Sequence, residues 1–252
     1  MTLLDRYEDP APIRPITRAD WAYTGVGLVY PTLLTAVYFL ALADAPPLIQ
    51  QSVYAVGKFI QFGLPCWWAS RNPATRWRPF RPSLRGIVVG IGFGLVVGVA
   101  MVLLFRVALS ETTLAFRMRD VIVQKLLGFR ISTTYHYAAL ALFYCLIHSG
   151  LEEYYWRWFV HRSCRECLRS ARLASLSSSL GFMAHHVLLL GVFLGWTSPW
   201  TWFCSVGVAV GGVFWAWLYD RTNRITAAWL SHMLVDVAIF AIGFTLVASS
   251  LR

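Results

Sequence analysis

The sequence predicts an all-α protein, a polytopic bundle of transmembrane helices with about seven spans. Of the 252 residues, 58% are hydrophobic and only 13% are charged, whereas a soluble domain has about 25% charged residues. The apolar residues also gather into stretches of roughly 20, the length that crosses the hydrocarbon core of a bilayer. A soluble fold could not bury this much apolar surface, so we expect an integral membrane protein.

Seven stretches are long and apolar enough to span a membrane, and a range of six to eight spans is compatible with the pattern. They are 21–43, 49–70, 86–109, 135–160, 173–195, 200–219 and 225–248. The segment 110–134 mixes charged and apolar residues, so it is either an interfacial helix or part of an eighth, irregular element. Residues 1–20 lack the apolar core of a signal peptide and are expected to form a soluble arm. Residues 21–252 are expected to form a single transmembrane domain.

The net charge of +10 is carried mainly by arginines between the apolar stretches. With the N-terminus inside, the inner loops hold many more arginines than the outer loops, so the positive-inside rule predicts a cytoplasmic N-terminus. We expect these arginines to contact anionic lipids, and we do not expect a nucleic-acid partner. The lack of an N-terminal targeting segment and the compact length favour a prokaryotic cytoplasmic membrane.

Small residues recur at helical spacing in two of the spans. In the third span a glycine stands at every fourth position, and the sixth span carries a shorter pair. Such stripes allow a second helix to approach closely, and a flexible gate is the alternative interpretation. The residues are Gly86, Gly90, Gly94 and Gly98, followed by Gly207 and Gly211.

The fourth span contains ionisable residues, which are costly inside a bilayer and normally face a bundle interior or a cavity. Glu152 and Glu153 are adjacent, so their side chains point about 100° apart on a helix. Arg157 lies four residues after Glu153 and can pair with it. Glu152, with His148 one turn before it, is then free for chemistry.

Two further spans carry similar residues. The fifth contains the adjacent His185 and His186, and the seventh contains His232 and Asp236, four residues apart on one face. At about 1.5 Å per residue, Glu152, His186 and the His232–Asp236 pair all lie roughly 10–20 Å from the cytoplasmic ends of their spans. This agreement in depth favours one shared site over scattered structural polar residues.

The order of these motifs, EExxxR, FxxxH and HxxxD, each within a predicted span, resembles the CAAX-protease and bacteriocin-processing family of intramembrane endopeptidases. That family includes the Ras-converting CAAX endopeptidases. The resemblance covers a catalytic core of about residues 135–248, with Asp236 where the processing enzymes often have Asn, and with seven spans where eight are common. The matching residues are Glu152, Glu153, Arg157, Phe182, His186, His232 and Asp236.

The resemblance implies an intramembrane endopeptidase that hydrolyses a membrane-anchored protein or peptide. Glu152 would activate a water as general base, with His186 as its partner. His232 and Asp236 would face the oxyanion. Glu153 and Arg157 would support the site. Phe182, the first residue of the FxxxH motif, would support it as well.

Several alternatives remain at this stage. No cofactor is expected, but Glu152, His186 and His232 could bind zinc. The protein could also be a non-proteolytic relative that acts as an immunity factor or scaffold, or a membrane protein that binds haem or a metal through His186 and His232. The substrate could be a prenylated CAAX tail, a bacteriocin leader or the C-terminal anchor of a sorted protein.

Overall fold

The computed structural model describes residues 15–71 and 83–252, and within these ranges every regular element is a helix. The all-α prediction is therefore confirmed. The elements in chain order are α1 (Arg18–Ala36), η1 (Val37–Ala41), α2 (Pro47–Arg71), α3 (Leu84–Leu104), η2 (Phe105–Leu109), α4 (Thr113–Gly128), α5 (Thr134–Leu142), η3 (Phe143–His148), α6 (Ser149–Glu153), η4 (Tyr154–His161), α7 (Arg162–Leu168), α8 (Ala171–Leu194), α9 (Pro199–Thr222), α10 (Thr226–Val247) and η5 (Ala248–Ser250).

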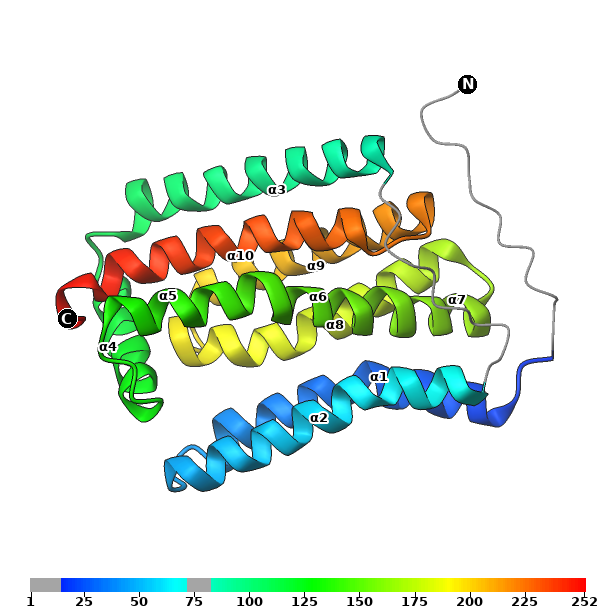
Figure 1. The fold of residues 1–252 in the computed structure, drawn as a ribbon, viewed down its shortest axis with the longest axis horizontal. Helices are drawn as coiled ribbons and strands as arrows, with labels where there is room; N and C mark the ends of the chain where they lie inside the picture. The colour runs from blue at the N-terminus through cyan, green and yellow to red at the C-terminus, as the bar shows by residue number, and fades with distance from the viewer. Residues whose placement is uncertain (1–14, 72–82) are drawn as a thin grey trace.

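The long helices run roughly side by side along the longest axis of the molecule (Figure 1). The most extensive helix pairs are α3 with α10 and α8 with α9, and α1 packs along α8. The segments from α5 to α7 follow one another without a break and form one rod through the bundle (Figure 1). This rod contacts α8, α9 and α10, so it lies among the helices that carry the remaining polar residues.

Five of the helical stretches are long and apolar enough to cross a membrane. They correspond to five of the seven predicted spans and are Arg18–Ala41, Leu84–Leu109, Ala171–Leu194, Pro199–Thr222 and Thr226–Ser250. The predicted spans 49–70 and 135–160 coincide with α2 and with the α5–α7 rod, and their crossing of the membrane stays a prediction. Helix α4, from the mixed segment 110–134, lies across one end of the bundle (Figure 1), which favours the interfacial alternative.

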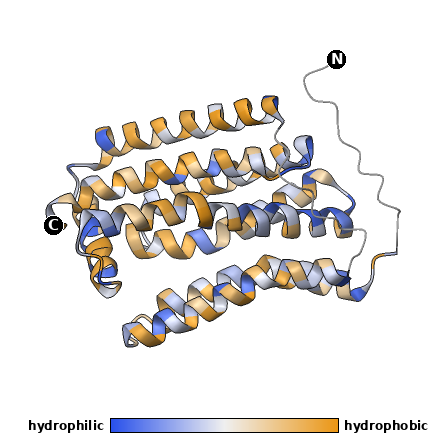
Figure 2. Cartoon of the chain, viewed as in Figure 1, coloured by the Kyte–Doolittle hydropathy of each residue, from blue (hydrophilic) through white to orange (hydrophobic). Residues whose placement is uncertain are grey.

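Hydrophobic residues predominate along most of the helices (Figure 2), and many large apolar side chains are exposed. Phe59 in α2, Leu84 in α3 and Val107 in η2 are more than three-quarters exposed. Polar residues instead lie inside, where Glu153 and Arg157 are fully buried. This distribution suits a protein whose surface faces lipid.

Three glycines of the α3 stripe face α10, as expected for close packing, and the fourth, Gly86, meets Thr222 of α9. A Cβ atom on Gly94 would lie 2.6 Å from the carbonyl oxygen of Ser231, and one on Gly98 would lie 3.3 Å from the Cβ of Ala238. A Cβ atom on Gly90 would collide with the carbonyl oxygen of Ala227. The backbones of α3 and α10 therefore touch, which only glycine allows.

The second glycine pair does not behave in this way. Nothing lies within 4 Å of a Cβ atom placed on Gly207, and one on Gly211 meets only Trp215 of its own helix. The close contact between α8 and α9 is made one residue later, where a Cβ atom on Gly212 would lie 3.0 Å from Ser179. The expectation for Gly207 and Gly211 was wrong because it used spacing without knowing which face of α9 meets α8.

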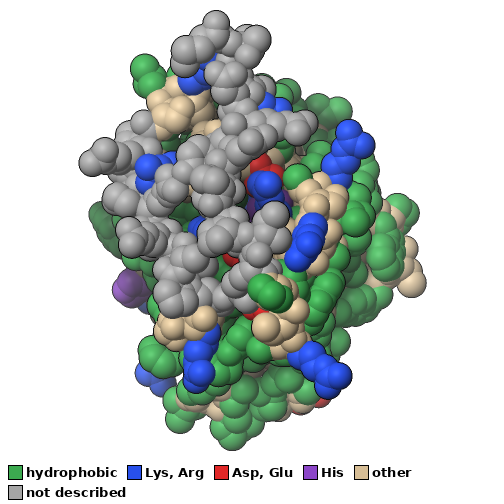
Figure 3. Space-filling view, turned by 90° about the vertical axis from the view of Figure 1, so that its right-hand side faces the viewer, with side chains coloured by type: hydrophobic (Ala, Val, Ile, Leu, Met, Phe, Trp, Pro, Cys, Tyr) green, Lys and Arg blue, Asp and Glu red, His purple; other side chains and the backbone are tan. Residues whose placement is uncertain are grey.

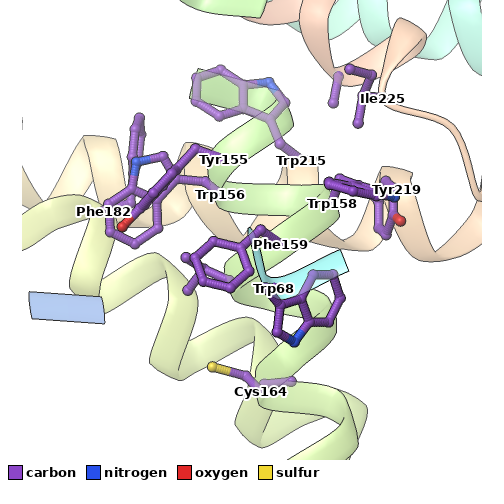
Figure 4. Close-up of a cluster of buried hydrophobic side chains, with 13 residues drawn as sticks. Trp68, Tyr155, Trp156, Trp158, Phe159, Cys164, Phe182, Trp215, Tyr219 and Ile225 are labelled. Carbon is purple, nitrogen blue, oxygen red and sulfur yellow. The ribbon is translucent and has the colours of Figure 1, made fainter. Parts of the chain in front are cut away.

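An aromatic cluster fixes the rod against its neighbours (Figure 4). Trp68 of α2 packs on Trp158 and Phe159 of η4, with ring centroids 5.8 and 5.4 Å apart. Trp156 of η4 packs on Phe182 of α8 at 5.5 Å. These rings are almost completely buried, so the rod, α2 and α8 share one core.

Arginines gather at the end of the bundle that holds α7 and the α9–α10 turn. Figure 3 views this end and shows basic side chains spread over it. The described members are Arg18, Arg71, Arg85, Arg162, Arg165, Arg169, Arg172, Arg221 and Arg224. The other arginines that we assigned to this side, Arg6, Arg14, Arg76, Arg78 and Arg81, lie outside the described residues, as does most of the predicted arm 1–20.

Candidate active site

The helix geometry of the rod changes on both sides of the two glutamates. Segment η3 before them and segment η4 after them are π-helical, and only the short α6 between them is an α-helix. A π-helix is wider than an α-helix and commonly occurs at functional sites. These turns place Glu152 and Glu153 at the end of α6, where both side chains are buried.

Glu153 is held by two partners. Its Oε2 accepts from Arg157 Nε at 3.0 Å, and its Oε1 accepts from Arg157 Nη2 at 3.4 Å. Its Oε1 also lies 2.9 Å from His232 Nδ1 on α10. The predicted pairing of Glu153 with Arg157 is therefore present, and both carboxylate oxygens are occupied.

Glu152 is in a different situation. Its Oε1 lies 3.8 Å from His185 Nε2 of α8, and its Oε2 lies 3.7 Å from His232 Nε2. Both distances are longer than a direct hydrogen bond. The carboxylate is buried and is surrounded by imidazole rings, yet within the described structure its oxygens accept no direct hydrogen bond.

His232 connects the two glutamates to the third carboxylate. Its Nδ1 faces Glu153, and its Nε2 faces both Glu152 and Asp236 Oδ1, the latter at 3.8 Å. The indole of Trp215 on α9 stacks on the imidazole with ring centroids 4.3 Å apart and an interplanar angle of 16°. The Trp215 Nε1–H donates to Ser231 Oγ at 3.0 Å, which fixes the indole in this position.

The two adjacent histidines of α8 take different positions. His185 stacks on Trp156 with an interplanar angle of 3°, and it is the histidine within 4 Å of Glu152. His186, the expected partner of Glu152, has its Nδ1 2.9 Å from the carbonyl oxygen of Phe182. That carbonyl can only accept, so Nδ1 carries the proton and Nε2 keeps its lone pair. His186 still interacts electrostatically with Glu152.

Phe182, the first residue of the FxxxH motif, has a structural role that the motif does not explain. The guanidinium carbon of Arg157 lies 5.2 Å from the centroid of the Phe182 ring and 5.5 Å from that of Trp215. Cation–π contacts of this kind stabilise a buried guanidinium. Phe182 also lies against the His186 ring, with ring centroids 4.5 Å apart, so it links the Arg157–Glu153 pair to the histidines.

Several groups near Glu152 had no predicted role. From α2, Lys58 interacts electrostatically with Glu152, and Tyr54 does so as well. Tyr144 and His148 of η3 complete this side, with ring centroids 4.8 Å apart. Two features of the sequence could have indicated these residues. Tyr144, His148 and Glu152 follow one another at a spacing of four, and Lys58 is a lone lysine within an apolar span.

The zinc alternative finds no support in the geometry. Within the described ranges, no three His, Cys, Asp or Glu side chains converge closely enough to hold a metal ion. The proposed ligand set of Glu152, His186 and His232 therefore does not form a metal centre in this conformation. We derive no step through a metal.

The comparison with known families gives a match. Residues 134–238 match the model of a family described as type II CAAX prenyl endopeptidase, Rce1-like. The match includes every residue of the site from Glu152 to Asp236. No curated protein and no solved structure matches the chain. Residues 134–238 are therefore similar to the Rce1-like family of CAAX endopeptidases, and the long apolar helices identify the chain as an integral membrane protein.

Proposed function

We propose that this protein is a glutamate-dependent intramembrane endopeptidase that cleaves a membrane-anchored protein or peptide. The observation that carries the proposal is the difference between the two glutamates. Glu153 has both oxygens occupied by Arg157 and His232, whereas Glu152 lies beside His185 and His232 without a direct hydrogen bond. A general base needs a free lone pair, so Glu152 is the base.

In the first step Glu152 takes a proton from water while the water oxygen bonds to the scissile carbonyl carbon. His186 serves as its partner, because its Nδ1 is fixed by the Phe182 carbonyl and its Nε2 can accept a proton. His185 orients the Glu152 carboxylate from the other side.

The negative charge then develops on the former carbonyl oxygen. His232 Nε2 and Asp236 face the same space beside Glu152. They would donate hydrogen bonds to this oxyanion, His232 as the imidazolium, since its Nδ1–H already donates to Glu153, and Asp236 in its protonated form. When the intermediate collapses, the C–N bond breaks and Glu152 returns its proton to the leaving amine. The Glu153–Arg157 pair keeps His232 in place.

The test compares membrane-protein termini in cells that express the wild type or the Glu152→Gln variant. A positioned base contributes about 10²–10⁴ in rate, so termini produced by the wild type should disappear in the variant. The substrates identified in this way should then be cleaved by the purified protein in detergent at a rate reduced by the same factor. Equal termini in both strains would contradict the proposal and favour a non-proteolytic relative.

A further inference from the structure

Lys58 is an unusual residue in α2. Apart from Arg71 at the very end of the helix, it is the only acidic or basic residue in the 25 residues of α2. It stands near the middle of the helix, among apolar side chains that face outward, such as Phe59 and Val56. A cation at this depth is costly and marks a functional position unless it has a partner.

The ammonium group of Lys58 points toward the site. It lies 5.4 Å from the ring centroids of both Tyr54 and Phe62, which precede and follow it by one turn. Phe62 in turn packs edge-on against His148 of the rod, at 6.3 Å. The aromatic rings therefore hold Lys58 on the face of α2 that meets the rod.

Lys58 nevertheless has no counter-ion among the residues that the structure describes. It interacts with Glu152 through space, but no ion pair joins the two groups in the described part of the chain. His148, one turn before Glu152, likewise has a buried Nε2 with no hydrogen-bond partner in residues 15–71 and 83–252. A cation without a counter-ion and a polar nitrogen without a hydrogen-bond partner, both among the described residues, thus lie beside the reacting carboxylate, from two different elements.

We infer that Lys58 is a specificity-determining residue that binds a carboxylate of the peptide substrate, with His148 beside it. This inference rests on the proposed endopeptidase function. A substrate carboxylate would supply the anion that Lys58 lacks, and it would place the scissile bond next to Glu152. The carboxylate could be the free C-terminal group of the segment that is released, or the side chain of an Asp or Glu within it.

Binding is measured on the Glu152→Gln background, so that no cleavage is needed. The probes are three dye-labelled S-farnesylated peptides: one that ends in Cys-Val-Ile-Ala as the free acid, the same peptide as the C-terminal amide, and an amide in which Glu replaces the last residue. A charge-assisted hydrogen bond predicts that the free acid or the Glu peptide binds on the order of 10- to 100-fold more tightly than the plain amide. Tighter binding of the free acid identifies a C-terminal carboxylate, and tighter binding of the Glu peptide identifies a side chain.

Lys58→Met should remove this difference, and Lys58→Arg should restore most of it. Lys125→Met is the matched control, because Lys125 is also held by two aromatic rings, those of Tyr38 and Phe39, each at 5.0 Å. That variant should keep the full preference. If all three peptides bind equally to the protein that retains Lys58, or if none binds, the assignment of Lys58 is wrong.

Cleavage by the protein with Glu152 intact separates this inference from the proposed function. If Lys58 only balances the charge of Glu152, Lys58→Met should lower kcat for acid and amide alike. If it binds the carboxylate, the variant should raise KM for the preferred peptide and leave the plain amide unchanged. If the carboxylate peptide binds more tightly through Lys58 but no peptide is cleaved, the proposed endopeptidase function is wrong and the carboxylate site at Lys58 still stands.

Discussion

At the scale of single residues, the buried Glu153–Arg157 pair should contribute to stability and Glu152 should not. Both side chains of the pair are fully buried. Glu153→Gln removes the charge that Arg157 faces, and breaking such a pair costs about 3–5 kcal/mol. We therefore expect Glu153→Gln to lower the thermal unfolding temperature in detergent, with Glu152→Gln close to the wild type.

A second Glu–Arg pair provides the control. Arg162 and Glu166 have the same spacing of four, but their closest atoms are 3.7 Å apart and both side chains are partly exposed. Exposed pairs contribute about 0–1 kcal/mol, so Glu166→Gln should unfold near the wild-type temperature. If Glu153→Gln and Glu166→Gln lower the unfolding temperature equally, burial of the Glu153–Arg157 pair is not what stabilises the rod.

The two histidines of α8 should also differ. His186 keeps a free Nε2 lone pair because Phe182 fixes its tautomer, whereas His185 stacks on Trp156 and lies near Glu152. We expect His186→Ala to lower kcat by about 10²–10⁴, as loss of a proton-transfer group does, and His185→Ala to have a smaller effect. Exposed His136→Ala serves as the control. If His185→Ala lowers kcat more than His186→Ala does, His185 is the proton-transfer partner of Glu152 and His186 is not.

The sequence predicted some of these positions better than others. Spacing of four within one helix correctly paired Glu153 with Arg157 and placed His232 near Asp236. Contacts between different helices could not be predicted in this way. The spacing of residues shows which of them share one face of a helix, but it does not show which other helix packs against that face. The stacking of Trp215 on His232 and the approach of Lys58 to Glu152 therefore appear only in the structure.

At the scale of elements, the rod could be predicted only in part. The stretch 135–160 was expected to be one long helix, and it is helical throughout. Its π-helical turns were not expected, since the hydrophobic pattern of a buried helix does not distinguish 3.6 residues per turn from a wider turn. These turns rotate the residues before and after α6, which lets His148, Glu152 and Glu153 face different neighbours.

The contact between α3 and α10 should affect both stability and activity. A methyl group on Gly94 would press on the carbonyl of Ser231, the residue before His232. Relieving that contact requires the two helices to separate, and overpacking of this kind costs about 1–3 kcal/mol. We expect Gly94→Ala to lower both the unfolding temperature and kcat.

Gly92 of the same helix is the control for this change. Nothing lies within 4 Å of a Cβ atom at Gly92, and alanine favours a helix over glycine by about 0.5–1 kcal/mol. Gly92→Ala should therefore leave the protein as stable as the wild type or slightly more stable. If Gly94→Ala behaves in the same way, the close approach of α3 to α10 does not hold His232 in place.

At the scale of the whole molecule, the structure arranges basic residues that are far apart in the sequence. Nine described arginines lie at the end with α7, namely Arg18, Arg71, Arg85, Arg162, Arg165, Arg169, Arg172, Arg221 and Arg224. Six described basic residues lie toward the end with α4, namely Arg106, Arg117, Arg119, Lys125, Arg130 and Arg252. Span length and loop charge predicted this division, because both follow from the bilayer and do not depend on helix packing.

The orientation of the molecule in the membrane follows from this division. Basic residues are retained on the cytoplasmic side, so we expect the α7 end to face the cytoplasm. Single cysteines replace the exposed Arg172 at that end and the exposed Glu111 at the other, in a protein whose exposed Cys66 is changed to Ser. In intact cells an impermeant maleimide should label the Glu111→Cys protein and not the Arg172→Cys protein. Inverted vesicles should reverse the result, because they expose the cytoplasmic face. Labelling of Arg172→Cys in intact cells would show that the bundle lies the other way round, with the rod's two glutamates approached from the opposite side.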